Sequence, residues 1–154
     1  MVVNAVIDDV YWMRAALREA EKAAFSHEIP VGAVLVENGQ ILAANHNRTR
    51  EKESPLAHAE MLVLQTAQKS GRKYFEKSTL YVTLEPCIMC AGALWLARIG
   101  RLVYGCRDAK AGACGSLFNF PQDRRLNHRF PVEGGILAEE CALLLQDFFR
   151  KKRG

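Results

Sequence analysis

The chain has 154 residues, of which 49% are hydrophobic and 25% are charged, which predicts one globular domain over residues 1–154 with room for a continuous core. Its five cysteines, an odd number without regular spacing, argue against a disulfide-stapled secreted fold and for a reducing compartment. The formal net charge of +4 is modest and favours a polyanionic partner.

Two segments bear on the location of the protein. Residues 1–10 contain Asp8 and Asp9 and no basic residue, unlike the cationic start of a secretory signal. The most apolar run, residues 88–99, is too short to span a membrane and contains Arg98. We therefore expect a cytoplasmic protein without a membrane-spanning segment.

The first predicted element is an amphipathic helix. Apolar residues recur at helical spacing at positions 10, 13, 17, 20 and 24, and Asp8 or Asp9 can cap the start. Proline interrupts a helix, so Pro30 is the predicted stop. These features predict a helix that begins near Asp8 and ends before Pro30.

A β-hairpin is predicted next. Residues 31–36 and 41–44 are rich in strand-forming residues, and Glu37-Asn38-Gly39-Gln40 between them is a turn sequence. A second helix is predicted for residues 57–69, and residues 79–84 form a strong strand pattern.

The chain after residue 86 contains three further predicted elements. A helix is predicted for residues 87–97, with Gly100 as its stop, followed by a short strand at residues 101–105. Residues 108–131 resist assignment, and residues 138–151 are apolar at helical spacing. Strands joined by helices predict a layered α/β/α domain around a central sheet.

Two short motifs supply metal-binding side chains. His58-Ala59-Glu60 lies at one predicted helix start, and Pro86-Cys87-Ile88-Met89-Cys90 lies at the next. His58, Cys87 and Cys90 are zinc-type ligands, and three protein ligands leave one coordination position open, as in catalytic zinc sites. A helix start favours negative charge and lowers the pKa of a thiol toward the thiolate form that binds metal.

Glu60 supplies a carboxylate that is not needed as one of the three metal ligands. It lies two positions from His58, too near to be a routine fourth ligand from the same face but near enough to reach the open position. A carboxylate beside a zinc-bound water, whose pKa falls to about 7, can take its proton and deliver it elsewhere. The motifs therefore indicate a catalytic site.

Each motif alone has an ordinary interpretation. His-x-Glu can be a surface histidine near a solvated glutamate, and Cys-x-x-Cys can be half of a structural zinc finger or a redox dithiol. The sequence has no second close cysteine pair, and the redox interpretation leaves His58 and Glu60 without a role. Cys106, Cys114 and Cys141 are interpreted as small buried hydrophobic residues.

The two motifs together match the known signature of the zinc-dependent deaminases of the cytidine/deoxycytidylate deaminase-like family, which the chain resembles. Within that family it resembles the bacterial tRNA-specific adenosine deaminases, from Tyr11-Trp12-Met13 onward. The segments that carry this resemblance are Thr83-Leu84-Glu85-Pro86-Cys87, Met89-Cys90-Ala91-Gly92-Ala93, Arg107-Asp108-Ala109-Lys110, Gly115-Ser116-Leu117, Asn127-His128-Arg129 and Asp147-Phe148-Phe149.

The resemblance implies a fold and an activity. The expected fold is a three-layer α/β/α domain with a central, mixed and mostly five-stranded sheet. The expected protein is a homodimeric hydrolase with one Zn²⁺ per chain that converts adenosine to inosine at the wobble position of a tRNA anticodon stem-loop. Glu60 would take the proton of the activated water, which attacks C6 of adenine, and would then protonate the ring nitrogen and the leaving amine.

The resemblance also implies substrate contacts. Asn47 matches a position that contacts the flipped base, and an amide suits a purine edge. Asp108, Lys110 and Asn127 match positions near the anticodon nucleotides, and Arg150 with its basic neighbours fits phosphate contacts on the last helix.

Three further positions and one loop qualify the resemblance. Helical spacing predicts that Phe148 packs in the core and that Phe149 lies nearer the substrate. Leu56 stands where the family pattern has threonine, so the hydroxyl expected beside the site is missing. Residues 120–126 are individual to this chain, and no RNA contact is carried over to them.

Two other functions remain open on the sequence. A deaminase of a free nucleobase or nucleoside, of guanine or cytosine type, would share the zinc ligands and Glu60 but would have little need of clustered basic residues. A non-catalytic, zinc-stabilised RNA-binding module would close the site with a fourth ligand such as His46 or Cys106 and would not depend on Glu60.

Overall fold

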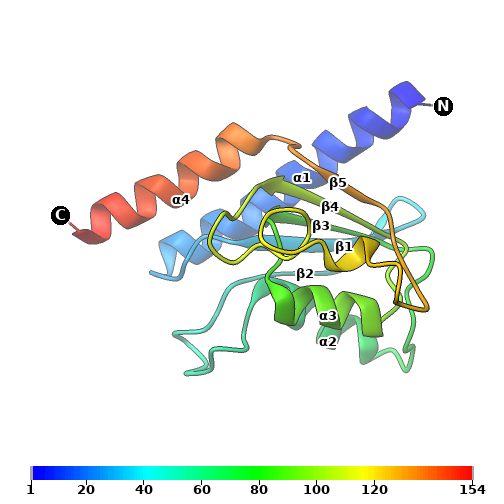
Figure 1. Cartoon of the computed structure of the whole chain (residues 1–154). Coiled ribbons are helices and arrows are strands. Elements are labelled where there is room, and N and C mark those ends of the chain that lie inside the picture. Colours follow the sequence, from blue (N-terminus) through cyan, green and yellow to red (C-terminus); the bar gives the residue numbers. More distant parts are fainter. Residues whose placement is uncertain (1, 154) are drawn as a thin grey trace.

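The computed structural model of the protein describes residues 2–153, with side chains from residue 9 onward. Within that range, five strands form one mixed sheet in the order β2–β1–β3–β4–β5, with two helices on each face (Figure 1). The strands are β1 (Gly32–Glu37), β2 (Gln40–His46), β3 (Thr79–Leu84), β4 (Arg101–Cys106) and β5 (Val132–Gly134). The helices are α1 (Val2–Phe25), α2 (Ala59–Gln68), α3 (Ile88–Leu96) and α4 (Ala138–Arg153), with a short 3-10 helix, η1 (Phe120–Gln122).

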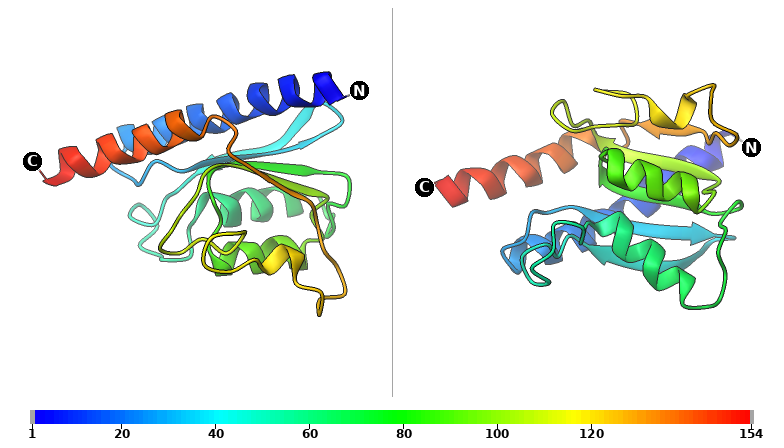
Figure 2. Two further views of the ribbon diagram at one scale, coloured as in Figure 1. Left: turned by 45° about the horizontal axis from the view of Figure 1, so that its top comes forward. Right: turned by 60° about the horizontal axis from the view of Figure 1, so that its bottom comes forward.

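The helices form two layers around the sheet, which confirms the expected α/β/α fold. Figure 2 shows α1 and α4 side by side over one face in its left view, and α2 and α3 across the other face in its right view. None of the helices in the described range combines the length and apolar character that a bilayer crossing requires.

The directions of the strands bring three strand ends to one edge of the sheet. β1 pairs antiparallel with β2 and with β3, whereas β3, β4 and β5 run parallel. Gly32 at the start of β1 therefore pairs with His46 at the end of β2, and Leu84 at the end of β3 pairs with Cys106 at the end of β4. The segments that follow β2, β3 and β4 leave the sheet at the same edge.

Alternate side chains of each central strand enter two separate cores. On β1, Ala33 and Leu35 pack in the core that contains α2 and α3, whereas Val34 and Val36 pack in the core that contains α1. This period of two follows from the pleat of a strand. A side chain at Gly32 would overlap the backbone of α1, so glycine there allows the helix to lie directly on the sheet.

The predicted hairpin is confirmed. Glu37 pairs with Gln40, and Asn38 and Gly39 between them have φ values of 52° and 72°. Two successive positive φ values are the signature of a type I′ turn, which asparagine and glycine tolerate best.

Both ends of the first helix differ from the prediction. α1 begins at Val2 rather than at Asp8 or Asp9, so neither aspartate caps it. Asp9 is instead buried, where it accepts hydrogen bonds from Arg101 at 2.7 and 2.8 Å and from the Tyr81 hydroxyl at 2.8 Å. The side chain of Asp8 lies outside the described side chains.

The helix ends are set by backbone geometry rather than by the expected stop residues. α1 ends at Phe25 because His27 adopts a φ of 63°, well before Pro30. Arg98, with a φ of 54°, ends α3 in the same way, two residues before Gly100. At both ends the amide after the left-handed residue donates to a carbonyl five residues back, which is the Schellman motif.

The segment that resisted assignment is mostly irregular. Between β4 and β5 the described chain contains η1 and an isolated bridge between Cys114 and Asn119. The sequence does not predict β5, because three residues are too few to show the alternation of apolar and polar side chains that marks a strand. Its pairing with β4 also depends on the long irregular segment between the two strands.

Candidate metal and substrate site

The predicted metal ligands lie at the starts of two neighbouring helices. His58 is the N-cap of α2 and Cys87 is the N-cap of α3, each with an extended backbone and no capping hydrogen bond from its side chain. A side chain that does not cap its own helix is free to point at a ligand. Cys90 lies one turn into α3 and is buried.

The three ligand atoms converge on one point. The Nδ1 atom of His58 lies 3.6 Å from Cys87 Sγ and 3.5 Å from Cys90 Sγ, and all three atoms lie within 4.8 Å of one another. Zinc bonds of 2.0–2.3 Å at tetrahedral angles require ligand separations of about 3.5–3.8 Å. The donor set and its spacing therefore fit zinc.

The ligand side chains are electrostatically coupled. The hydrogen bond from the Cys90 thiol, and then the His58 imidazole, lower the pKa of Cys87 to about 3. The hydrogen bond with Cys87 and the nearby Glu60 carboxylate raise the pKa of His58. Cys87 is thus already poised as a thiolate, which is the form of cysteine that binds a metal ion.

Glu60 lies in the first turn of α2, beside the ligands. Its side chain is 4% exposed, and burial raises its pKa to about 7. A carboxyl group with a pKa near neutrality can both accept and donate a proton under working conditions. This is the property that the predicted proton carrier requires.

A cavity of about 620 Å³ opens over these residues. Glu60, His58 and Cys87 line it together with two of the predicted substrate residues, Asn47 and Asp108. The remaining lining residues are Ile29, Val31, Thr49, Glu53, Ser54, Pro55, Ala59, Leu84, Glu85 and Ala111. We refer to it as the site cavity. Its volume lies within the range of small-molecule sites.

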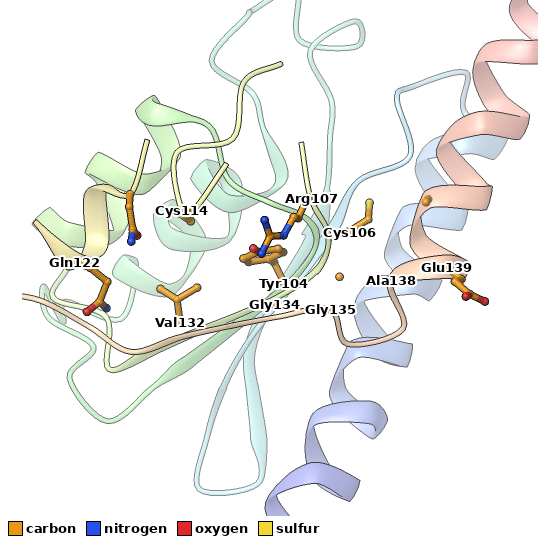
Figure 3. Close-up of a pocket in the computed structure, with 14 residues that line it drawn as sticks. Tyr104, Cys106, Arg107, Cys114, Gln122, Val132, Gly134, Gly135, Ala138 and Glu139 are labelled. Atoms are coloured by element: carbon orange, nitrogen blue, oxygen red, sulfur yellow. The ribbon is translucent and has the colours of Figure 1, made fainter. Parts of the chain in front are cut away.

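A second hollow of about 730 Å³ lies between β4, β5 and the start of α4 (Figure 3). Arg107 reaches toward Tyr104 at its edge, and Gln122 and Glu139 lie at its margins. None of the three metal-type ligands lines it. We therefore place the candidate chemistry in the smaller site cavity.

Four predicted substrate residues lie outside the lining of the site cavity. Lys110 is exposed in the turn that follows Asp108. Asn127 lines a small hollow beside Trp95 and Leu96, at the opposite end of α3 from Cys87. On α4, Phe149 is 40% exposed and Arg150 is exposed and paired with Asp147, so their contacts with RNA stay predictions.

Two buried glutamates to which the sequence assigned no role, Glu28 and Glu85, hold loops of the site cavity. Glu28 accepts hydrogen bonds from the amides of Arg50 and Glu51, at 3.0 and 2.7 Å, and so holds the loop that follows Asn47. Glu85 accepts hydrogen bonds from the segment after β4. The sequence did hold one signal for Glu85: it directly follows an apolar strand pattern and directly precedes Pro86, which places it at the end of a buried strand.

Glu60 and Glu85 border the same cavity with opposite proton affinities. Burial raises the pKa of Glu60 to about 7, whereas for Glu85 hydrogen bonds from Ser116 and from backbone amides outweigh burial and lower the pKa. This difference agrees with the predicted role of Glu60 as proton carrier and favours the ionised form of Glu85.

The closed-site alternative lacks its fourth ligand among the described residues. His46 Nδ1 lies 3.0 Å from the carbonyl oxygen of Asn47, and Cys106 Sγ lies 3.5 Å from that of Thr83. Neither joins the ligand cluster in that range. Burial also raises the pKa of Cys106 to about 11 and that of Cys114 to about 12, which leaves both as inert thiols.

The departure at Leu56 falls on the surface of the protein. Its side chain is 59% exposed, and its backbone amide donates a hydrogen bond to Ser54 Oγ at 3.2 Å. The lining of the site cavity does not include Leu56. The substitution therefore changes the rim of the site and leaves the ligand cluster unaltered.

The chain matches known proteins over nearly its whole length. Residues 7–153 match the family model of the MafB19-like deaminases. A tRNA-specific adenosine deaminase of Bacillus subtilis (strain 168) is 48% identical over 146 residues, which cover 94% of this chain and 91% of that protein.

Two solved structures with different substrates in their descriptions are also similar to the chain. One from biochemical and structural studies of A-to-I editing by tRNA:A34 deaminases at the wobble position of transfer RNA has a TM-score of 0.84 and 43% identity, covering 88% of this chain and 99% of that one. A guanine deaminase from Nitrosomonas europaea has a TM-score of 0.75 and 25% identity, covering 90% of this chain and 83% of that one.

Proposed function

The chain belongs to the MafB19-like deaminases and resembles most strongly the tRNA-specific adenosine deaminases among the relatives described above, and on that premise we propose that it converts the wobble adenosine of a tRNA anticodon to inosine. The observation that carries the proposal is the convergence of three zinc-type ligand atoms and a buried carboxylate on one cavity. The supporting similarity is higher for the tRNA-acting relatives than for the guanine deaminase.

His58, Cys87 and Cys90 would hold the zinc ion, which supplies a Lewis acid that makes water acidic near neutral pH. Glu60, as a carboxylate, takes a proton from the water whose oxygen bonds to C6 of adenine. It passes that proton to the ring nitrogen N1, and a further proton from the same water to the departing amine. The bond between C6 and the exocyclic amine nitrogen then breaks, and ammonia and inosine are the products.

The dimensions of the site cavity bear on how the base reaches Glu60. About 620 Å³ is a volume typical of a site for one small molecule, which suits a single nucleotide turned out of the stack of the anticodon loop. Asn47 lies in the cavity wall, where its amide can both donate to and accept from a purine edge. The burial of Glu60 limits the access of bulk water to the reacting atoms.

The proposal includes the remaining expectations from the sequence. These are one zinc ion per chain, a tRNA anticodon stem-loop as substrate, a homodimer, a single deaminase domain over residues 1–154 and a cytoplasmic location. Exposed apolar side chains around α3 support a protein–protein interface there; they are Ile88, Leu96, Leu117 and Phe118. Exposed basic residues on α4 support contacts with phosphate.

Deamination of an isolated anticodon stem-loop tests the proposed function. The purified, zinc-loaded protein is incubated with a stem-loop that carries adenosine at the wobble position and with the same loop carrying cytidine. Mass spectrometry should find inosine in the first and unchanged cytidine in the second. Conversion of cytidine, or of neither base, would contradict the proposal.

The rival function is tested in the same assay. Free adenosine, guanine and cytosine are supplied at the concentration of the stem-loop. A deaminase of free bases would convert at least one of them faster than the RNA. We expect conversion of the stem-loop to exceed that of each free compound.

A further inference from the structure

Glu85 has no part in the proton transfers, yet its carboxylate is among the best-held groups of the molecule. Glu85 is 2% exposed and stands in the chain between Leu84, the last residue of β3, and Pro86. Oε1 accepts hydrogen bonds from the Asp108 amide at 3.1 Å and the Ser116 hydroxyl at 2.5 Å, and Oε2 accepts from the amides of Cys114 and Ser116, each at 3.0 Å.

These four donors use the whole capacity of the group. A carboxylate offers about four lone-pair sites, and each oxygen of Glu85 here receives two donors. The donors come from both ends of one segment, residues 107–116, which we call the wall loop. The Ala113 amide also donates to the Pro86 carbonyl at 2.9 Å, so the loop is tied to the backbone next to Cys87.

The wall loop leaves no spare room around this carboxylate. A Cβ atom at Gly112 would overlap the carboxyl carbon and both oxygens of Glu85. The backbone of Gly112 has no positive φ, so alanine at that position meets no conformational strain apart from the overlap. Contact with Glu85 therefore accounts for the absence of a side chain there.

The wall loop separates the site cavity from the second hollow. Asp108 and Ala111 line the site cavity on one side, whereas Arg107, Cys114 and Gly115 line the second hollow on the other (Figure 3). The loop also carries Lys110, whose amide is held by the Asp108 carboxylate at 3.0 Å. A shift of the loop would move one wall of the site cavity relative to the metal ligands.

We propose that Glu85 is a positioning residue that fixes the wall loop at a set distance from the metal ligands, and thereby fixes the cavity wall and the Lys110 turn against which the RNA substrate binds. The substrate named here rests on the proposed function. The attachment itself does not, because it follows from the hydrogen bonds of one carboxylate that stands two residues before Cys87.

Glu85→Gln tests the attachment with little change in volume. The carboxamide keeps one acceptor oxygen and puts an NH₂ group in place of the other, so at least one backbone N–H group loses its partner. Misplacing the wall should raise KM for the anticodon stem-loop about tenfold or more, with kcat within about threefold and zinc content unchanged. A fall in kcat through loss of zinc or of folded protein, with KM unchanged, would overturn the positioning role.

Gly112→Ala tests the same contact from the opposite side and does not alter the carboxylate. It should raise KM for the stem-loop in the wild-type background, whereas in the Glu85→Ala background, where the overlap is relieved, it should add little further increase. Equal increases from Gly112→Ala in both backgrounds would contradict the proposal.

Hydrogen exchange separates this proposal from the proposed function. In Glu85→Gln, the amides of Asp108, Cys114 and Ser116 should exchange faster than in the wild type, whatever the substrate is. Unchanged exchange at all three amides would overturn the attachment. Failure of the wild-type protein to deaminate the stem-loop would instead reject the proposed function and leave the exchange result to decide the role of Glu85.

Discussion

The site cavity and the last turn of α4 both contain residues expected to act on or bind RNA, but those of the cavity are largely buried and those of α4 are exposed. In the cavity, Glu60 is buried and its pKa is shifted by its surroundings. The last turn of α4 carries four exposed basic residues, Arg150–Arg153. Charges in a buried, water-poor setting interact strongly and over fixed distances, whereas exposed charges are screened by water and salt.

This contrast predicts two kinds of mutational effect. Removal of a buried group should cost orders of magnitude in rate or several kcal/mol in stability, because its partners are left without compensation. Removal of an exposed charge should produce a small, salt-dependent change in binding.

The largest expected effect follows from Glu60→Gln. The amide has the shape of the carboxyl group but cannot accept a proton from water, so kcat should fall about 10²–10⁴-fold. Zinc content, measured by atomic absorption, should remain at the wild-type level. Glu53→Gln, at an exposed position of the same cavity lining, is the control and should retain near-normal kcat. Near-normal turnover by Glu60→Gln would remove its assigned role.

A second large effect concerns stability and compares a partly buried with an exposed ion pair. The Asp9 side chain is 5% exposed and pairs at 2.7 Å with Arg101, whose side chain is 32% exposed, whereas Arg125 pairs with Asp123 at 2.6 Å on the surface. Asp9→Asn should lower the free energy of unfolding by about 2 kcal/mol, because Arg101 loses a charged hydrogen-bond partner and only part of its guanidinium can turn to water instead. Asp123→Asn should leave the denaturant midpoint almost unchanged. Similar midpoints for the two variants would break the comparison.

The same pair predicts a dependence of stability on pH. Burial tends to raise the pKa of Asp9, but hydrogen bonds from Arg101 and Tyr81 outweigh it and hold the pKa below 3.8. An aspartate whose folded pKa is depressed contributes stability above its unfolded pKa of about 3.9, and loses that contribution as the pH falls through the folded value. Urea titrations from pH 6 to pH 3 should therefore show a smaller acid-induced loss for Asp9→Asn than for the wild type. A parallel loss in both proteins would contradict this assignment.

The smallest effect is expected on α4. Lys151→Gln combined with Lys152→Gln should leave kcat unchanged and raise KM for the stem-loop a few-fold. The slope of log binding against log salt should fall by about 1 for each phosphate that the variant no longer neutralises. Lys73→Gln is the control, because this exposed lysine precedes β3 at the opposite edge of the sheet from the site cavity. An unchanged salt slope in the double variant would exclude α4 from the binding surface.

Features that depend on a few neighbouring residues could be predicted from the sequence. The Asn38-Gly39 turn, the helix starts at His58 and Cys87 and the alternating strands each follow from local chemistry. The layered fold followed from the order of these elements.

Features that depend on contacts between distant segments could not be predicted from local patterns. His27 and Arg98 adopt left-handed backbone conformations that end their helices, although neither is the glycine that usually marks such a position in a sequence. The ion pair of Asp9 and Arg101 joins residues 92 positions apart, so nothing near Asp9 in the sequence indicates that it pairs with a strand residue instead of capping a helix. The role of Glu85 could not be predicted, because the groups that donate hydrogen bonds to it lie in a loop that resisted assignment.

Zinc titration of the metal-free protein tests the central claim most directly. The protein is treated with a chelator, zinc is added in steps, and inosine formed in the anticodon stem-loop is measured together with bound metal. Activity should be absent without zinc, rise in proportion to bound zinc and level off at one ion per chain, and it should remain absent in Cys90→Ser at the same zinc concentrations. Full activity in the metal-free protein, or in Cys90→Ser without bound zinc, would contradict the account.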